Sequence, residues 1–210
     1  MQVLANGLSF EVESRGSKTA PVVLLTMGLG MQLTAWPAAL VDALLDQGYR
    51  VITYDNRDIG LSSHLDQYGV PHLILASIKA RLGFAIDSPY RLADMAQDAL
   101  GILDGLDIER AHIIGVSMGG MISQRIAIAA PNRVLSLTSI MSSSGAPRLP
   151  NARADVAKAM LSRPKSAKID DIVDRSMSLF QLIGSPAYPQ DLPALRARLI
   201  ASTLRSYHPE

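Results

Sequence analysis

A serine between glycines is the feature of this sequence most able to do chemistry. Residues His112–Gly120 have the sequence HIIGVSMGG, so Ser117 lies in a G-x-S-x-G-G pattern directly after an apolar, strand-like run. A serine at a sharp strand-to-helix turn has a strained backbone that exposes its Oγ above the sheet. Gly115 and Gly119 suit such a turn, because side chains there would collide with the neighbouring strand and helix. The pattern predicts that Ser117 is a nucleophile; the alternative is a serine that caps a helix after a glycine turn.

A second glycine-rich turn, Met27–Met31 (MGLGM), follows the apolar run Pro21–Thr26. We expect this turn beside Ser117, with the backbone N–H groups of Leu29 and Met118 converging on one oxygen as an oxyanion hole. The helix that begins after the serine also directs free N–H groups and the positive end of its dipole toward negative charge forming there. The alternative is a turn between strand and helix that serves packing only.

An alternation of strand-like and helix-like segments predicts the scaffold that positions these turns. Strands are predicted at residues 2–5, 8–14, 21–26, 49–54, 111–115 and 134–141. Helices are predicted at residues 36–47, 73–82, 91–106, 118–130, 151–162, 168–182 and 191–204. The pair Asn6-Gly7 predicts a hairpin between the first two strands. Alternating strands and helices with short links predict an α/β fold, with a mostly parallel sheet and helices on both faces.

The composition excludes several classes of protein. The chain has 210 residues, enough for one well-filled domain, and 48% of them are hydrophobic against 19% charged. The 20 Lys and Arg residues against 19 Asp and Glu residues leave a net charge of +1, which gives no reason to expect a nucleic-acid partner. Cysteine is absent, which excludes disulfides, thiolate metal sites and a cysteine nucleophile. Without a secretory signal or an apolar run of about 18 residues, we expect a cytoplasmic protein with no membrane partner.

Three segments together resemble the α/β-hydrolase superfamily, and within it the serine esterases and methylesterases that carry a helical lid after the sixth strand. The segments are Met27–Gly30, Asp55–Ser62 (DNRDIGLS) and Gly115–Gly120. The resemblance implies that the protein cleaves a small carboxylic ester through an acyl-enzyme on Ser117 and requires no metal or cofactor. Met27 stands where the family usually has histidine, and Asp58 stands where it usually has glycine. We interpret Arg57 and Asp58 as structural residues.

The resemblance also implies a core at residues 1–146 with the first six strands, and a helical lid segment at residues 147–210, truncated before the last strands. The family orders its triad as serine, acid and histidine, and the only histidine after Ser117 is His208, which we do not expect to be the base. We therefore expect the acid and the histidine outside this chain, and an inactive 210-residue chain on its own. The missing C-terminal segment of the same protein, or a second copy, is the expected partner, beside the small-molecule ester substrate.

Two further expectations concern surfaces. The strand at residues 134–141 should lie at an open sheet edge, apolar on both faces, which favours association. The lid segment holds apolar residues that either line an acyl pocket or serve ordinary packing: Met160, Leu161, Met177, Leu179, Phe180, Leu182 and Ile183. The alternative function is a catalytically incomplete hydrolase-like protein that binds a small apolar ligand or a partner.

Overall fold

The computed structural model describes residues 1–69, 84, 88–146, 148–149 and 152–207. These residues form two compact units, Met1–Ser144 and Gly145–Tyr207, each of which is described by itself. The helix predicted at residues 73–82 lies outside the described residues. Within the described parts of both units, no helix is long and apolar enough to cross a membrane.

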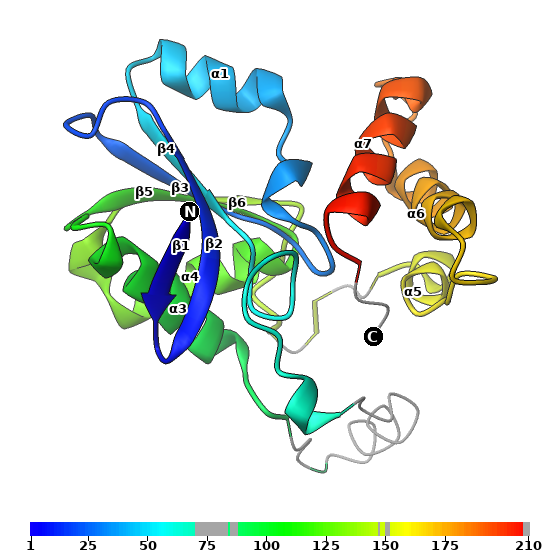
Figure 1. Cartoon of the computed structure of the whole chain (residues 1–210), viewed down its shortest axis with the longest axis horizontal. Helices are drawn as coiled ribbons and strands as arrows, with labels where there is room; N and C mark the ends of the chain where they lie inside the picture. The colour runs from blue at the N-terminus through cyan, green and yellow to red at the C-terminus, as the bar shows by residue number, and fades with distance from the viewer. Residues whose placement is uncertain (70–83, 85–87, 147, 150–151, 208–210) are drawn as a thin grey trace. The chain divides into compact units, whose positions relative to one another are not determined.

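A six-stranded sheet in the order β1-β2-β4-β3-β5-β6 forms the centre of the first unit (Figure 1). Its strands are β1 (Gln2–Ala5), β2 (Leu8–Arg15), β3 (Val22–Thr26), β4 (Arg50–Tyr54), β5 (Ala111–Val116) and β6 (Val134–Ile140). The first two pairings, β1 with β2 and β2 with β4, are antiparallel. The other three pairings are parallel. This confirms the predicted α/β class with a mostly parallel sheet.

Helices cover the two faces of this sheet, as Figure 1 shows. The helices of this unit are α1 (Ala38–Asp46), α3 (Leu92–Gly105) and α4 (Met118–Ala129). α1 packs on one face, where Val41 and Trp36 lie against Val51. α3 and α4 pack on the other face, in a larger apolar cluster. Both central strands β3 and β4 are buried at every position, which explains their continuous apolar sequences.

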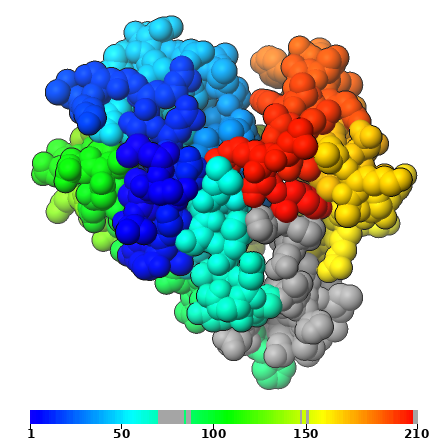
Figure 2. Space-filling model, in the orientation of Figure 1, coloured from blue at the N-terminus to red at the C-terminus, as the bar shows by residue number. Residues whose placement is uncertain are grey.

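The hairpin at the start of the chain forms as its turn residues predict. Asn6 and Gly7 both have positive φ, 50° and 76°, as a tight turn between β1 and β2 requires. The segment after β4 lies against this hairpin, and the two are side by side in Figure 2. The Ser62 hydroxyl accepts a hydrogen bond from the Glu11 N–H at 3.0 Å, and the Ser63 hydroxyl accepts one from the Ser9 N–H at 2.8 Å. The hairpin therefore forms one edge of the sheet and holds the loop that follows β4 in place.

The other edge of the sheet is β6, which is exposed along almost its whole length. Leu135 and Leu137 are each 41% exposed, and they alternate with Ser136 and Thr138. Because successive side chains of a strand point to opposite faces, Ser139 shares a face with Leu137 while Ser136 and Thr138 share the other, so both faces of β6 carry polar side chains. The expectation of a strand apolar on both faces is therefore wrong in detail.

Three helices make up the second unit: α5 (Ala154–Met160), α6 (Ile169–Ile183) and α7 (Leu192–Arg205). Val173 on α6 and Leu195 on α7 are buried, with 0% and 5% of their surface exposed. Arg196 of α7 joins the two helices through ion pairs with Asp170 and Asp174 of α6, at 2.8 and 2.5 Å. The role of this unit as a lid stays a prediction.

Candidate active site

Ser117 occupies the junction between β5, which ends at Val116, and α4, which begins at Met118. Its backbone angles are φ 56° and ψ −122°, a combination that residues other than glycine rarely adopt. A Cβ at Gly115 would overlap the Gly119 carbonyl group, and a Cβ at Gly119 would lie 2.7 Å from the Met27 carbonyl oxygen. The glycines therefore let β5, α4 and the end of β3 approach closely around a strained serine.

The turn after β3 lies directly against this serine. A Cβ built on Gly28 would be 3.2 Å from the Ser117 Cβ and 3.7 Å from its Oγ. The Asn56 side chain donates a hydrogen bond to the Met27 carbonyl at 3.1 Å, and the Met31 N–H donates one to the Gly28 carbonyl at 3.3 Å. These bonds hold the turn whose next residue, Leu29, was predicted to supply an oxyanion donor. The catalytic roles of Ser117, Leu29 and Met118 stay predictions.

Asp55 ties the loop after β4 to the segment that follows the Gly28 turn. Its carboxylate is fully buried and accepts hydrogen bonds from the Leu33 N–H at 2.7 Å and the Leu61 N–H at 3.0 Å. The Ser62 hydroxyl donates to the Asp55 carbonyl at 2.7 Å. A buried carboxylate that accepts backbone N–H bonds from two segments has a structural role, because its hydrogen-bonding capacity is used within the fold to hold those segments together.

Arg57 forms the second buried polar contact of this loop. Its guanidinium donates two hydrogen bonds to the Asp98 carboxylate, both of 2.7 Å, and lies 4.9 Å from the centre of the Tyr90 ring. Burial lowers the pKa of Arg57, but the bonds to Asp98 outweigh it and the pKa rises. Burial, followed by a hydrogen bond with Asp58, raises the pKa of the Tyr90 hydroxyl.

The residue Asp58 has φ 63°, in the left-handed region that favours glycine. Aspartate is one of the few other residues that visit this region, because its short side chain bonds locally. Here the carboxylate accepts a hydrogen bond from the Leu65 N–H at 2.7 Å. Aspartate thus occupies a conformation that glycine also favours, and the contacts of Arg57 and Asp58 agree with their interpretation as structural residues.

This chain is similar in sequence to known proteins over most of its length. A family model described as the alpha/beta hydrolase fold matches residues 21–182. The chain belongs to the α/β-hydrolase family. It is 29% identical over 206 residues to rhodomycin D methylesterase DnrP of Streptomyces peucetius, covering 89% of this chain and 62% of that protein. It is 35% identical over 125 residues to a putative carbamate hydrolase, RutD, of Variovorax paradoxus, covering 60% and 39%.

Solved structures show the same fold. The meta-cleavage product hydrolase of Pseudomonas fluorescens superposes with a TM-score of 0.67 at 21% identity, over 96% of this chain and 63% of that one. A hydrolase of Pseudomonas aeruginosa gives a TM-score of 0.60 at 23% identity, over 95% and 66%. This α/β hydrolase thus spans less than two thirds of the length of the two curated relatives.

The histidines of this α/β hydrolase have other partners. His112 is the second residue of β5, near the end of the strand opposite Ser117, and its Nδ1 is 2.7 Å from the Ser136 hydroxyl. His64 lies with its Nε2 3.2 Å from the Gly60 carbonyl oxygen. In the part of the chain that the structure describes, no histidine forms a hydrogen bond with the Ser117 hydroxyl. The other two histidines, at positions 72 and 208, lie outside that part.

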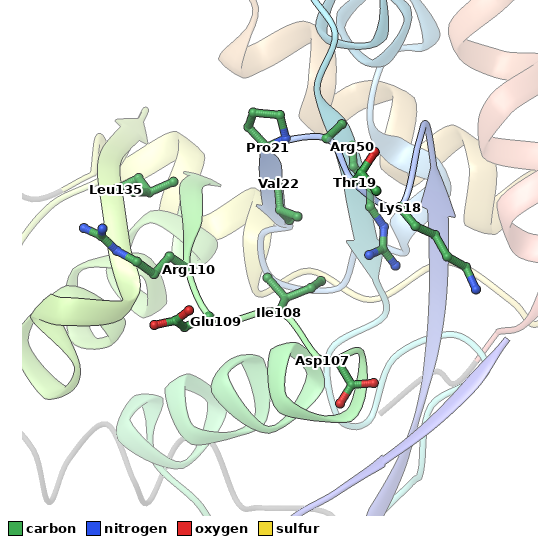
Figure 3. A pocket seen from close by; sticks show the side chains of 11 residues that line it. Lys18, Thr19, Pro21, Val22, Arg50, Asp107, Ile108, Glu109, Arg110 and Leu135 are labelled. Carbon is green, nitrogen blue, oxygen red and sulfur yellow. The ribbon is translucent and has the colours of Figure 1, made fainter.

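Two cavities in the described part of this α/β hydrolase lie away from the serine. The first, of about 390 Å³, opens at the amino ends of the parallel strands and is lined by three cations and two acids (Figure 3). They are Lys18, Arg50, Arg110, Asp107 and Glu109. The second, of about 200 Å³, lies between β2, β4 and α1, next to Trp36. Neither of these two cavities includes Ser117, whose distinguishing features are its backbone strain and the close packing around it.

Sequence reasoning missed Asp98, the buried partner of Arg57. The signal was present, because Asp98 stands three residues after Met95 and four before Ile102, on the apolar side of the helix at 91–106. An acid on the core-facing side of an amphipathic helix is almost always paired when it is buried.

Among the described residues, no cluster of His, Asp or Glu could hold a metal ion.

Proposed function

We propose that this chain carries the nucleophilic part of a serine ester hydrolase that acts on small carboxylic esters. The observation that carries the proposal is the strained backbone of Ser117 at a strand-to-helix junction, with Gly28 packed against its side chain. The Ser117 Oγ bonds to the acyl carbon, and the alcohol leaves with the proton that a general base took from that hydroxyl. Water then cleaves the acyl-enzyme. The N–H groups of Leu29 and Met118 stabilise the oxyanion.

The substrate class is supported by the proteins that the chain is similar to. Their names specify a methylesterase, a putative carbamate hydrolase and an enol-lactonase. Each of these substrates has a carbonyl carbon bonded to an oxygen or nitrogen leaving group. A serine nucleophile beside backbone N–H donors suits this class of bond, because the tetrahedral intermediate carries its negative charge on the former carbonyl oxygen.

We also propose that the general base and its acid lie outside residues 1–210, in the C-terminal segment of the same protein or in a second copy. The described histidines at positions 64 and 112 have other partners, which supports this. The exposed strand β6 supports it too, because its free edge can pair with a further strand. The partner would then complete both the sheet and the catalytic relay.

The test combines an active-site probe with a substrate. The 210-residue chain, the protein expressed from its full source reading frame, and the Ser117→Ala variant of each are treated with a fluorophosphonate and assayed with p-nitrophenyl acetate. We expect labelling and hydrolysis in the full protein, a loss of about 10⁴-fold or more in its Ser117→Ala variant, and little activity in the 210-residue chain.

Two results would contradict parts of the proposal. Hydrolysis at ordinary esterase rates by the 210-residue chain alone would overturn the external base. Absence of labelling in the full protein would favour the alternative, a hydrolase-like protein that binds a small apolar ligand or a partner.

A further inference from the structure

The third glycine of the serine motif makes room for a different part of the chain than the first two. Gly115 and Gly119 admit β5, α4 and the end of β3. A Cβ at Gly120, however, would lie 2.6 Å from the Ser142 Cβ and 2.7 Å from the Ser139 Oγ. Gly120 therefore allows the segment that leaves β6 to pass directly over the first turn of α4.

This segment holds the backbone of the candidate nucleophile on both sides. The Ser117 N–H donates a hydrogen bond to the Ile140 carbonyl at 2.9 Å. The Ser142 hydroxyl donates one to the Ser117 carbonyl at 2.7 Å. Between them Met141 has φ 48° and a side chain that is 75% exposed, so the chain turns outward there and returns at Ser142.

The path of this segment is fixed independently of Ser142. The Gln124 side chain of α4 donates hydrogen bonds to the Ser139 hydroxyl at 3.4 Å and to the Ser143 carbonyl at 3.3 Å. Removing the Ser142 hydroxyl therefore leaves these anchors in place. The loss is confined to the bond that reaches the Ser117 carbonyl.

A strained residue keeps its conformation only where its surroundings over-determine it. The Ser117 carbonyl also accepts the first helical bonds of α4, from the Gly120 N–H at 3.0 Å and the Met121 N–H at 3.3 Å. Those bonds belong to the first turn of α4, whereas Ser142 approaches from the segment that follows β6. Without it, the peptide between Ser117 and Met118 loses this side-chain anchor, and rotation of that peptide moves the Met118 N–H away from the oxygen it should bind.

We propose that Ser142 is a positioning residue for the reaction of Ser117, acting through the carbonyl group of the nucleophile itself. The inference rests on the proposed function of Ser117 as the nucleophile. It assigns a reason to the third glycine of the motif, because only a residue without a side chain at position 120 lets Ser142 approach. It also makes β6 part of the active-site scaffold.

The experiment compares Ser142→Ala, Ser142→Thr and Ser136→Ala in the full protein, with p-nitrophenyl acetate and a fluorophosphonate titration of reactive serine. Ser136→Ala is the matched control, because it removes a hydroxyl from β6, the strand that leads to Ser142, at the end where β6 meets His112. We expect Ser142→Ala to lower kcat by about 10- to 100-fold with KM changed less than about twofold, since small displacements of reacting groups have effects of this size. Ser142→Thr keeps the hydroxyl and should restore most of kcat.

Hydrogen exchange in the 210-residue chain supplies a readout that needs no activity. The backbone amides at positions 117–121 should exchange faster in Ser142→Ala than in the unmodified chain, Ser142→Thr or Ser136→Ala. Unchanged kcat and unchanged exchange in Ser142→Ala would overturn the inference, as would a loss that appears only in the thermal midpoint. If Ser117→Ala abolishes activity while Ser142→Ala does not, only this inference fails. If Ser117→Ala keeps its activity, the proposed function fails as well.

Discussion

The two ends of the parallel sheet are built differently. At the carboxyl ends of β3, β4 and β5, the chain turns through Gly28, Asp55 and Ser117, where polar groups are buried and the backbone is strained. At the amino ends, charged side chains surround an open cavity (Figure 3), and the ion pair of Arg133 with Asp104 is exposed. Ligands of open α/β sheets bind beyond the carboxyl ends of the strands. Tight packing therefore distinguishes the end that we expect to be functional. The same type of substitution should lower the free energy of unfolding more at the carboxyl ends of the strands than at the amino ends.

The largest difference is expected for glycine-to-alanine substitutions. At the carboxyl end, Gly119→Ala places a Cβ 2.7 Å from the Met27 carbonyl oxygen and should lower the free energy of unfolding by about 4 kcal/mol or more. At the amino end, a Cβ on Gly48 meets nothing within 4 Å, so only its φ of 82° matters, and Gly48→Ala should lower it by about 1–2 kcal/mol. Urea unfolding measures both. Equal losses would contradict the comparison.

Ion pairs provide the next test. Arg57→Ala removes the cationic partner of the buried Asp98 carboxylate, which keeps its hydrogen bond from the Asn6 side chain, and should lower the free energy of unfolding by about 3–5 kcal/mol. The control Asp104→Ala removes the ion pair with Arg133 at a carboxylate that is 63% exposed and leaves the bonds of Arg133 to the Glu109 and Ile108 carbonyls, so its loss should stay within about 1 kcal/mol. Thermal and urea unfolding of the two variants give the values. A mild effect of Arg57→Ala would show that water reaches Asp98.

Alkaline pH tests the buried tyrosine at the end of β4. Burial raises the pKa of Tyr54 above its ordinary value of 10.0, so the folded protein keeps the proton that the unfolded chain releases. Stability is therefore unaffected below pH 10 and falls above it, by about 1.4 kcal/mol per pH unit for one such group. Tyr54→Phe should remove part of this slope, while at pH 7 it removes only the 3.3 Å hydrogen bond to Thr26. An unchanged slope in the variant would contradict the assignment to Tyr54.

The smallest effect is expected at the start of β5. His112→Ala removes a hydrogen bond to Ser136 and an edge-to-face contact with Tyr49, for a loss of about 1 kcal/mol in unfolding free energy. Hydrolysis of p-nitrophenyl acetate by the full protein should change less than about twofold, because the ring lies at the opposite end of the strand from Ser117. A large loss of kcat with an intact fold would identify His112 as part of the catalytic relay and reverse the comparison.

Much of this architecture could be predicted from local patterns. The helix predicted at residues 91–106 is observed as Leu92–Gly105, and the hairpin at Asn6-Gly7 forms as expected, because periodic burial and turn chemistry are properties of short segments. The prediction of β6 was less accurate. Its strand is present, but Ser136, Thr138 and Ser139 place polar side chains on both of its faces.

Long-range pairings could not be predicted from the same patterns. Arg57 and Asp98 are 41 positions apart, and their side chains meet because the loop after β4 returns toward α3. The contact of Ser142 with Ser117 spans 25 positions and depends on β6 lying beside β5. No periodicity or motif specifies either distance.

The sequence by itself determined the kinds of element, the family and the choice of Ser117 as the predicted nucleophile, because these depend on neighbours along the chain. The tertiary structure alone decided which groups meet around Ser117. Strand order and loop path bring Gly28 against its side chain and Ser142 onto its carbonyl group. The physical reason is that a strained serine is stable only when several distant segments hold it, and their positions are fixed by packing of the whole sheet.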